Sequence, residues 1–335
     1  MTGTSVVIPT YNRADLIGET LEAVLGQTLA PDEVIVVDDG STDGTAAVLA
    51  GFGSRVRHVP IPNSGDLVAR NTGLRAASSG LVAFCDSDDV WAPEFLAVMS
   101  AQWRAEPKLK VCYSNFCILR DGILSDRSKF DDAPESFWSG LRRTGPDSGA
   151  FDSPFIEKLL EFQPLFTSCM MVHRQAFMDL GGWDESVSRI VGCDFATALR
   201  VAAAPPTGIV RRVLVGIRKH GANISGDVER MNLGDARVLE HVLRTRPELA
   251  PWADDMRRSA AHRRRDALGS AFVRRDFAAV RDTFELLPPE ARSWKERVKW
   301  AIASLPAPLG ALAASVTGVS GLRPGAARPR QAGRG

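Results

Sequence analysis

Short runs of β-branched and other apolar residues alternate with helical patterns through the first third of the chain. The expected strands are Ser5–Ile8, Glu33–Val37, Val56–Val59, Leu81–Cys85 and Lys110–Tyr113. The expected helices between them are Ala14–Leu25, Thr45–Ala50, Leu67–Ala77 and Glu94–Arg104. Strands that alternate with helices form mostly parallel sheets covered on both faces. The pattern therefore predicts an α/β fold with a Rossmann-like, mostly parallel central sheet and flanking helices.

Beyond residue 120 the pattern is less regular. Asp121–Pro154 is rich in Gly, Ser, Asp and Pro, and we expect a long surface loop there, of the kind that often carries function. Further along, Leu165–Val172 and Ile209–Ile217 are expected strands, Gly181-Gly182 is an expected turn, and Asp194–Ala203 is an expected helix. From about Val228 onward we expect helices, with breaks at Pro251 and Pro288.

With 335 residues, the chain is long enough for one α/β domain and a helical appendage. We expect a nucleotide-binding, catalytic α/β domain in residues 1–226, a helical region in residues 227–322, and a disordered tail in residues 323–335, where Arg, Gly and Pro dominate. Residues 300–322 carry no charged side chain, but Pro306, Pro308 and Gly310 argue against a spanning helix.

The net charge of +1 conceals an asymmetry between the two parts of the chain. Residues 257–335 contain 16 Lys and Arg against 6 Asp and Glu, a net charge of +10, which leaves 25 against 34 in the rest, a net charge of −9. This basic region, together with Trp294 and Trp300, is typical of contact with an anionic membrane surface. The alternative is ordinary solvation of charged helices.

The cysteines and the N-terminal sequence indicate in which cell compartment the protein is expected. Five cysteines without a CxxC pair favour reduced, packed thiols over a disulfide framework or a zinc site. The N-terminus has no basic stretch followed by a long apolar run, so we expect no signal peptide. We expect a cytoplasmic protein, either free or peripheral on the inner face of the cell membrane, with no nucleic-acid partner.

Polar and acidic residues follow three of the expected strands. These segments are Pro9-Thr10-Tyr11-Asn12-Arg13, Asp38-Asp39-Gly40-Ser41 and Asp86-Ser87-Asp88-Asp89. Ligands of open parallel sheets lie beyond the carboxyl ends of the strands, so the three segments are expected to meet at one edge. Carboxylates gathered there repel one another unless a cation balances them, and Mg²⁺ or Mn²⁺ prefers such oxygen ligands. Taken alone, each acidic pair is also typical of a turn or helix cap.

Together these segments resemble the family 2 glycosyltransferases, inverting enzymes of the GT-A fold. The quoted stretches are VVIPTYNRADLIGETLEAVLGQT, EVIVVDDGSTDGT, NSGDLVARNTGLRAASSGLVAFCDSDD, GGWDESVSRIVGCDFATALR and RKHGANIS, which span about residues 4 to 225. The resemblance implies transfer of a sugar from a nucleotide diphosphate sugar, UDP before other nucleotides, to a hydroxyl of a glycan or lipid-linked glycan in cell-surface polysaccharide synthesis. No QxxRW segment is present, which favours nonprocessive transfer.

The resemblance also implies roles on the donor side. Its donor residues are Pro9, Thr10 and Tyr11 beside the nucleotide, Asp39 at the base or ribose, Arg70 at the base or phosphates, and Asp86 near the ribose. Asp88, the second aspartate of a DxD motif, is the implied ligand of Mn²⁺ or Mg²⁺, an ion that neutralises charge on the leaving diphosphate. His220 is either a metal ligand, a phosphate contact or a plain loop residue, and the same alternatives hold for Arg218.

On the acceptor side, the resemblance implies Asp194 as the catalytic base. A sugar hydroxyl is a weak nucleophile near neutral pH, so a carboxylate must take its proton. The alternative role for Asp194 is an N-cap of the helix that starts there. Cys193 departs from the family pattern, which has glutamate at that place. In the GGWDE turn, Trp183 is either a substrate contact or a core residue, and Asp184 and Glu185 are further acid candidates.

Two other functions compete with this one. A sugar-phosphate nucleotidyltransferase would need a glycine-rich, basic phosphate loop after the first strand, where this chain has Pro-Thr-Tyr-Asn. The chain also has no GxGxxG or Walker loop. A catalytically inactive binding protein on the same fold is the second alternative, and Cys193 is the residue that speaks for it. Donor sugar, acceptor and oligomeric state are not set by these residues.

Overall fold

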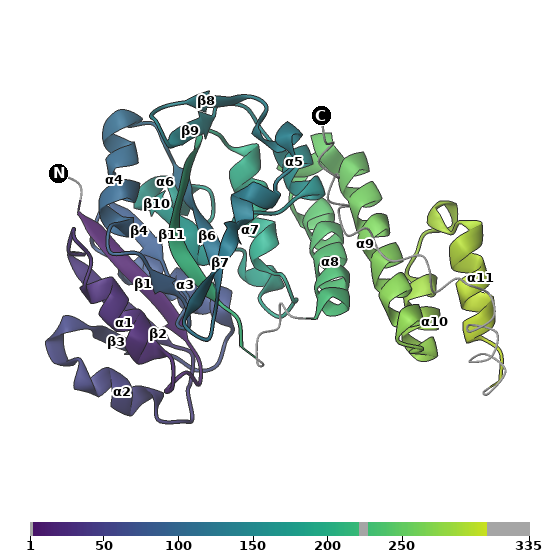
Figure 1. Cartoon of the computed structure of the whole chain (residues 1–335), viewed down its shortest axis with the longest axis horizontal. Helices are drawn as coiled ribbons and strands as arrows, with labels where there is room; N and C mark the ends of the chain where they lie inside the picture. The colour runs from purple at the N-terminus through teal and green to yellow at the C-terminus, as the bar shows by residue number, and fades with distance from the viewer. Residues whose placement is uncertain (1–2, 221–226, 307–335) are drawn as a thin grey trace, which may run out of the picture.

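The computed structural model describes residues 3–220 and 227–306. Its strands form one 11-stranded sheet in the order β3-β2-β1-β4-β10-β6-β11-β9-β8, with β5 paired to β11 and β7 to β6. The strands are β1 (Thr4–Thr10), β2 (Glu33–Asp38), β3 (Arg57–Pro60), β4 (Leu81–Phe84), β5 (Val90–Trp91), β6 (Val111–Arg120), β7 (Ile123–Ser128), β8 (Leu141–Arg143), β9 (Ser148–Phe151), β10 (Met170–His173) and β11 (Thr207–Arg218). Figure 1 shows the sheet between two groups of helices.

The N-terminal half of the sheet is parallel, as predicted. Strands β3, β2, β1 and β4 run in the same direction, whereas β10 is antiparallel to both of its neighbours, β4 and β6. Beyond β10, β6 and β11 are parallel, and β9 and β8 add an antiparallel edge. The α/β class with a Rossmann-like sheet is confirmed, and its second half is mixed.

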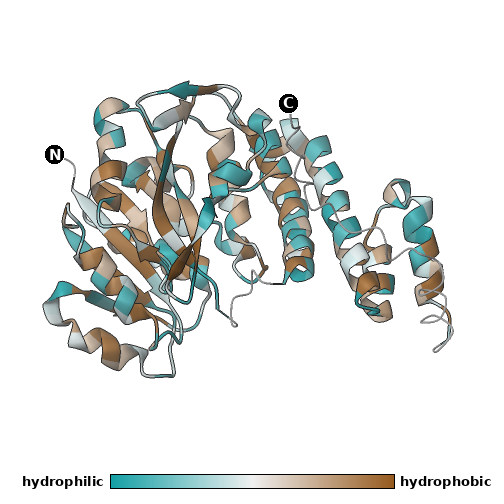
Figure 2. Cartoon of the chain, viewed as in Figure 1, coloured by the Kyte–Doolittle hydropathy of each residue, from teal (hydrophilic) through white to brown (hydrophobic). Residues whose placement is uncertain are grey.

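Helices cover both faces of the sheet because successive side chains of a strand point to opposite sides. The helices here are α1 (Ile17–Leu25), α2 (Thr45–Gly51), α3 (Asp66–Ala76), α4 (Phe95–Ala105), α5 (Ile156–Glu161), α6 (Arg174–Asp179) and α7 (Asp194–Ala203). Val7 of β1 lies in a core with residues of α3 and α7, while Val6 and Ile8 lie in another core with residues of α1, α2 and α4. Figure 2 shows the apolar residues gathered in the strands and on the inner helix faces.

Four further helices follow: α8 (Val228–Thr245), α9 (Ala253–Val273), α10 (Phe277–Glu285) and α11 (Trp294–Ala303). Val238 and Leu239 of α8 and Met256 of α9 belong to the same core as α7, so this part packs onto the α/β domain. The second half of α9 forms a separate small core with α10 and α11, which includes Phe272 and Phe284. In Figure 1 these last helices lie at the far end of the molecule from β1. The predicted domain boundary at residue 226 therefore precedes two helices, α8 and α9, that pack onto the core of the α/β domain.

The predicted surface loop at Asp121–Pro154 is wrong. This segment contains β7, β8, β9 and two 3-10 turns, η2 (Lys129–Asp132) and η3 (Glu135–Trp138). Phe130, Phe137 and Phe151 are all buried, and Phe137 packs edge-on against Trp138 with ring centroids 4.8 Å apart. Single aromatic anchors separated by turn residues have neither a helical nor a strand period, so the pattern of the sequence conceals their burial.

Most other predicted elements are confirmed, with shifts at their ends. In the expected strand Leu165–Val172 only β10 is a strand, preceded by a 3-10 turn, η4 (Thr167–Cys169), and β6 runs seven residues further than predicted, to Arg120. The predicted breaks coincide with the 3-10 turns η7 (Pro247–Trp252) and η8 (Pro289–Ala291). All five cysteines are unpaired and buried, as predicted.

The membrane-related predictions concern the end of the chain. Among residues 3–220 and 227–306, no helix combines the length and apolar character needed to cross a bilayer. Most of the uncharged stretch 300–322 and the whole predicted tail 323–335 lie outside the described residues, as does the end of the RKHGANIS segment.

Candidate active site

The segments that follow β1, β2 and β4 meet at one edge of the sheet, as predicted. Thr10 at the end of β1 is in register with Asp38 of β2, and Val7 of β1 is in register with Phe84 of β4. The backbone N–H of Asp39 donates to the Thr10 carbonyl at 2.8 Å. The residues at this edge come from segments that are far apart in the sequence but follow strands that are adjacent in the sheet.

Asp39 organises the loop in front of α3. Its two carboxylate oxygens accept hydrogen bonds from the backbone N–H groups of Ser64, at 2.6 Å, and Gly65, at 2.9 Å, and only 5% of the residue is exposed. Gly65 has φ of +100°, and a Cβ atom there would lie 2.4 Å from Ser188 Oγ, so the position favours glycine. The predicted contact of Asp39 with a base or ribose stays a prediction.

The three residues at the end of β1 differ in exposure. Pro9 and Thr10 are buried, and the Thr10 hydroxyl has no hydrogen-bond partner among the described residues. Tyr11 is 45% exposed, so its ring is the group among the three that can reach a flat ligand. Asn12 follows with φ of +51°, and its side-chain oxygen accepts from the Thr42 N–H at 2.8 Å. This bond ties the β1 loop to the β2 loop.

Arg70 of α3 lies beneath this edge. Its guanidinium donates to Asp66 Oδ2 at 2.6 Å and to Asp86 Oδ1 at 2.7 Å, and the side chain is only 6% exposed. Burial alone would lower the Arg70 pKa, but Asp86 and Asp66 raise it well above its usual value. Partial burial raises the pKa of Asp86 and the charge of Asp88 raises it further, against the lowering effect of Arg70, although 34% of the Asp86 side chain is exposed.

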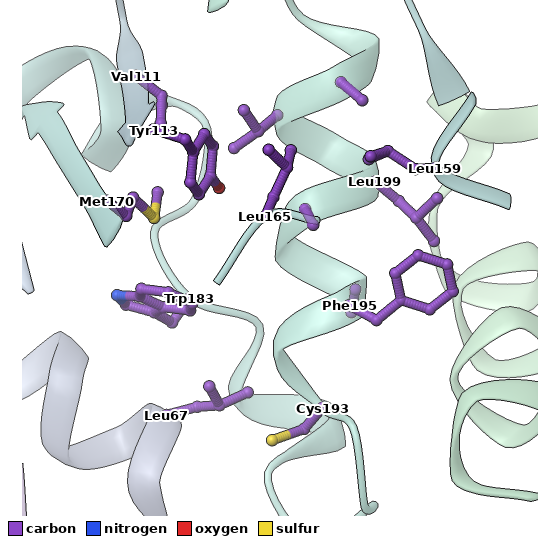
Figure 3. Close-up of a cluster of buried hydrophobic side chains, with 14 of the residues drawn as sticks. Leu67, Val111, Tyr113, Leu159, Leu165, Met170, Trp183, Cys193, Phe195 and Leu199 are labelled. Carbon is purple, nitrogen blue, oxygen red and sulfur yellow. The ribbon is translucent and has the colours of Figure 1, made fainter. Parts of the chain in front are cut away.

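Trp183 is a core residue that supports Arg70. It is 3% exposed, and its ring packs edge-on against Phe84 at a centroid distance of 5.1 Å. The Arg70 guanidinium lies over the indole, 5.1 Å from the ring centroid. Figure 3 shows the ring among buried apolar side chains. The alternative role of Trp183 as a core residue agrees with this burial, and its predicted substrate contact stays a prediction.

Asp88 and His220 lie together at the end of β11. His220 Nε2 is 3.1 Å from Asp88 Oδ2, and Arg13 Nε is 3.7 Å from the same oxygen. Within the part of the chain that the structure describes, no three His, Cys, Asp or Glu residues are grouped so as to enclose a metal ion. Mg²⁺ and Mn²⁺ are commonly held by one or two protein ligands while substrate phosphates fill other positions. Asp88 and His220 fit such an open site and not a closed cage.

Asp89 is a structural residue to which the sequence assigned no role. It is 3% exposed, and it accepts hydrogen bonds from the Arg218 N–H at 2.9 Å and from the Ser168 hydroxyl. The guanidinium of Arg218 donates to the Asp88 carbonyl at 2.8 Å. These contacts join the DxD turn to the end of β11 and so bring His220 to Asp88. A third aspartate directly after the DxD motif is the sequence signal that could have identified it.

Asp194 is the first residue of α7. The N-cap of α7 is Cys193, whose side chain makes no capping bond, so the alternative N-cap role of Asp194 is wrong. Burial raises the pKa of Asp194 to about 6; Arg70 lowers it, and the carboxylates of Asp235, Asp66 and Asp86 raise it further. The site therefore holds a carboxylate of unusually high basicity within electrostatic range of Arg70.

The two further acid candidates are engaged in the GGWDE turn. Burial alone would raise the pKa of Asp184, but hydrogen bonds from Ser186 and Arg246 lower it overall, and Arg246 Nη2 lies 2.7 Å from Asp184 Oδ2. Glu185 accepts from Asn71 Nδ2 at 2.7 Å. Both carboxylates thus hold the turn against α3 and the C-terminal helices.

Comparison with known proteins relates these features to a family. The family described as Glycosyl transferase family 2 matches residues 5–180. A protein of Bacillus subtilis (strain 168) named as a teichuronic acid biosynthesis glycosyltransferase, TuaG, is 38% identical over 137 residues, which cover 39% of this chain and 53% of that protein. Validoxylamine A glucosyltransferase of Streptomyces hygroscopicus subsp. limoneus is 31% identical over 244 residues, which cover 66% of this chain and 53% of that protein. The chain thus spans about half the length of these relatives.

A solved structure shares the fold. The crystal structure of S. aureus TarS 1–349 in complex with UDP-GlcNAc aligns with a TM-score of 0.59 and 18% identity, over 90% of this chain and 89% of that one.

Proposed function

Because this chain belongs to glycosyl transferase family 2, we propose that it transfers one sugar at a time, with inversion, from a nucleotide diphosphate sugar to a hydroxyl of a glycan or lipid-linked glycan. The supporting observation is the arrangement around Arg70: this buried cation bonds to Asp86 of the DxD turn and acts on Asp194 at the start of α7. Donor and acceptor functions are thereby linked through one guanidinium. The relative named for teichuronic acid biosynthesis supports a role in cell-surface polysaccharide synthesis.

On the donor side, the exposed Tyr11 ring is the stacking surface for the base, and Pro9 and Thr10 form the floor beneath it. Asp39 and Asp86 accept hydrogen bonds from the base or the ribose, while Arg70 and Arg13 bring positive charge to the diphosphate. UDP is the proposed nucleotide, in keeping with the UDP-GlcNAc complex of the TarS fold relative. Asp88 and His220 would hold Mn²⁺ or Mg²⁺. When bound, such an ion supplies positive charge that stabilises the departing diphosphate.

On the acceptor side, Asp194 takes the proton of the attacking hydroxyl. The acceptor oxygen forms a bond to the anomeric carbon from one face while the bond to the diphosphate oxygen breaks on the other, which inverts the configuration. With a pKa of about 6, Asp194 is ionised at neutral pH and is still a stronger base than an ordinary aspartate. Neither Asp184 nor Glu185 competes for this task, since Asp184 is paired with Arg246 and Glu185 accepts a hydrogen bond from Asn71 of α3.

The same proposal extends to the inner face of the cell membrane. At the far end of the molecule, Trp294 is 68% exposed and Trp300 37% exposed, next to the exposed side chains of Lys295 and Arg297. Exposed indoles beside basic residues suit the interface of an anionic bilayer. We propose that this surface of α11 contacts the cytoplasmic leaflet, where a lipid-linked acceptor would lie.

A thermal-shift panel tests the donor. The full chain is heated with UDP-glucose, UDP-GlcNAc, GDP-mannose or dTDP-glucose, each with and without Mn²⁺. We expect at least one UDP-sugar to raise the melting temperature, and more so with Mn²⁺, because a ligand that binds only the folded state stabilises it. Release of UDP by the wild-type protein then separates an enzyme from an inactive binding protein. No shift with any of the nucleotide sugars would contradict the proposal.

A further inference from the structure

Asp66, the first residue of α3, lies between Arg70 and Cys193. Its Oδ2 accepts from Arg70 Nη1 at 2.6 Å, and Cys193 Sγ lies 3.6 Å from Oδ1 and 3.8 Å from Oδ2. The Asp66 side chain is 44% exposed, in contrast to 6% for Arg70. Figure 3 shows the Cys193 sulfur directed toward the helix that carries Leu67, the neighbour of Asp66. A carboxylate therefore occupies the open side of the guanidinium, against the start of α7.

This carboxylate has a physical task that residue 193 does not perform. A guanidinium that is almost fully buried requires opposing charge on its donors, and Asp86 bonds only to Nη2. The start of α7 supplies a thiol in place of the glutamate of the family pattern. Since Cys193 Sγ already approaches both Asp66 oxygens, a longer acidic side chain at position 193 would reach the place that the Asp66 carboxylate now fills.

We propose that Asp66 is a positioning residue: from the first turn of α3 it supplies the carboxylate that position 193 lacks, and it holds the Arg70 guanidinium in its place beside Asp86. The catalytic role of Asp66 rests on the proposed function. Its replacement of a carboxylate at position 193 does not depend on that function. The charged groups that act on Asp194 are Arg70, Asp66, Asp86 and Asp235, and Asp235 is itself paired with Arg263 at 2.6 Å.

A mutational cycle tests the exchange without any substrate. Four proteins are compared by thermal denaturation at pH 7.5: wild type, Asp66→Ala, Cys193→Glu, and the double variant. Cys193→Glu should lower the melting temperature when Asp66 is present, because two carboxylates would then share one place. The same change should raise the melting temperature by several degrees when residue 66 is alanine, because Arg70 regains its partner. A shift of the same sign in both backgrounds would overturn the inference.

Reactivity of the thiol provides a second measurement that requires no large change of side chain. Burial raises the pKa of the Cys193 thiol, and Asp66 raises it further by its charge and its hydrogen bond. In Asp66→Asn, alkylation of Cys193 by iodoacetamide at pH 8, followed by peptide mass spectrometry, should be faster by ~5-fold, since more of the thiol is ionised. Cys117, which is also buried but has no contact with Asp66, serves as the internal control. An unchanged rate at Cys193 would contradict the contact.

The catalytic part is tested separately with the donor found in the panel. Asp66→Ala should lower kcat by ~10-fold with little change in donor KM, because the groups that react would no longer be held in the right geometry. Cys193→Glu in the Asp66→Ala background should restore most of the lost kcat. Asp254→Ala, which removes an exposed aspartate from a surface ion pair with Arg257, is the matched control and should change nothing. If the stability cycle and the alkylation agree with the inference while the wild type turns over no donor, the proposed function fails and the exchange of carboxylates stands. A kcat of Asp66→Ala equal to that of wild type would overturn the positioning role.

Discussion

Asp88 Oδ2 and His220 Nε2 lie 3.1 Å apart, although 132 residues separate them in the chain. The hydrogen bonds of the neighbouring Asp89 bring them together, since Asp89 accepts from the backbone of Arg218 at the end of β11. A carboxylate and an imidazole that meet at the carboxyl end of a sheet can provide two ligands for a divalent cation. The oxygens of a bound diphosphate would complete the coordination. The predictions below separate the residues that perform the chemistry from those that hold them in place.

The first prediction concerns the base. Asp194→Asn should bind the donor with the affinity of the wild type but lose transfer by ~10²- to 10⁴-fold, because proton removal and donor binding are separate tasks. Titration of the UDP-sugar by calorimetry and the rate of sugar transfer are the two measurements. Turnover at the wild-type rate would reject Asp194 as the base.

The second prediction concerns pH, where activity and stability change in opposite directions. The pKa of Asp194 is raised to about 6, so kcat/KM should rise through an acid limb near pH 6, as the carboxylate becomes ionised. A carboxyl whose folded pKa lies above its unfolded value binds more protons in the folded state between the two values, so its contribution to stability is lost as pH rises through 6. Asp194→Asn should therefore increase the free energy of unfolding at pH 7.5 by about 3 kcal/mol. Urea denaturation at pH 5 and pH 7.5 measures this, and equal effects at both pH values would contradict it.

The third prediction distinguishes Asp89 from Asp88. Asp89→Ala should lower the free energy of unfolding by about 3 kcal/mol, because it leaves the part-buried N–H of Arg218 and the buried hydroxyl of Ser168 without their acceptor. Asp88→Ala removes a side chain that is 15% exposed and should cost much less. Chemical denaturation of both variants under the same conditions compares them. A smaller loss for Asp89→Ala than for Asp88→Ala would contradict the structural role of Asp89.

The fourth prediction addresses the membrane surface. The double variant Trp294→Ala/Trp300→Ala should reduce sedimentation of the protein with vesicles that contain phosphatidylglycerol, and wild-type binding should weaken as salt is raised, because salt screens the basic residues. Ile123→Ala on β7 removes an apolar side chain that is 73% exposed, close to the 68% of Trp294, and is the control. Wild-type protein that does not sediment with these vesicles, or a double variant that binds as the wild type does, would argue against α11 as the contact.

The parts of the site that lie at strand ends are predictable from the sequence, because alternating strands and helices bring Thr10, Asp38 and Asp86 to one edge in any parallel sheet. The start of α7 at Asp194 is also predictable, because the helical pattern of residues 194–203 is local in the sequence. Contacts between distant segments are not: Asp66 and Cys193 are 127 residues apart, and their approach depends on how α3 and α7 pack. The burial of Trp183 and of Phe137 likewise follows from tertiary packing, which no periodic pattern encodes.

The most direct measurement of the central claim is calorimetric titration of UDP into the wild type, Asp88→Ala and Asp194→Asn, each with and without Mn²⁺. If Asp88 holds the cation against the diphosphate while Asp194 serves only the acceptor, Mn²⁺ should tighten UDP binding to the wild type and to Asp194→Asn by the same factor, of ~10-fold or more, and should not affect Asp88→Ala. Enhancement of UDP binding by Mn²⁺ that survives in Asp88→Ala, or is lost in Asp194→Asn, would contradict the account.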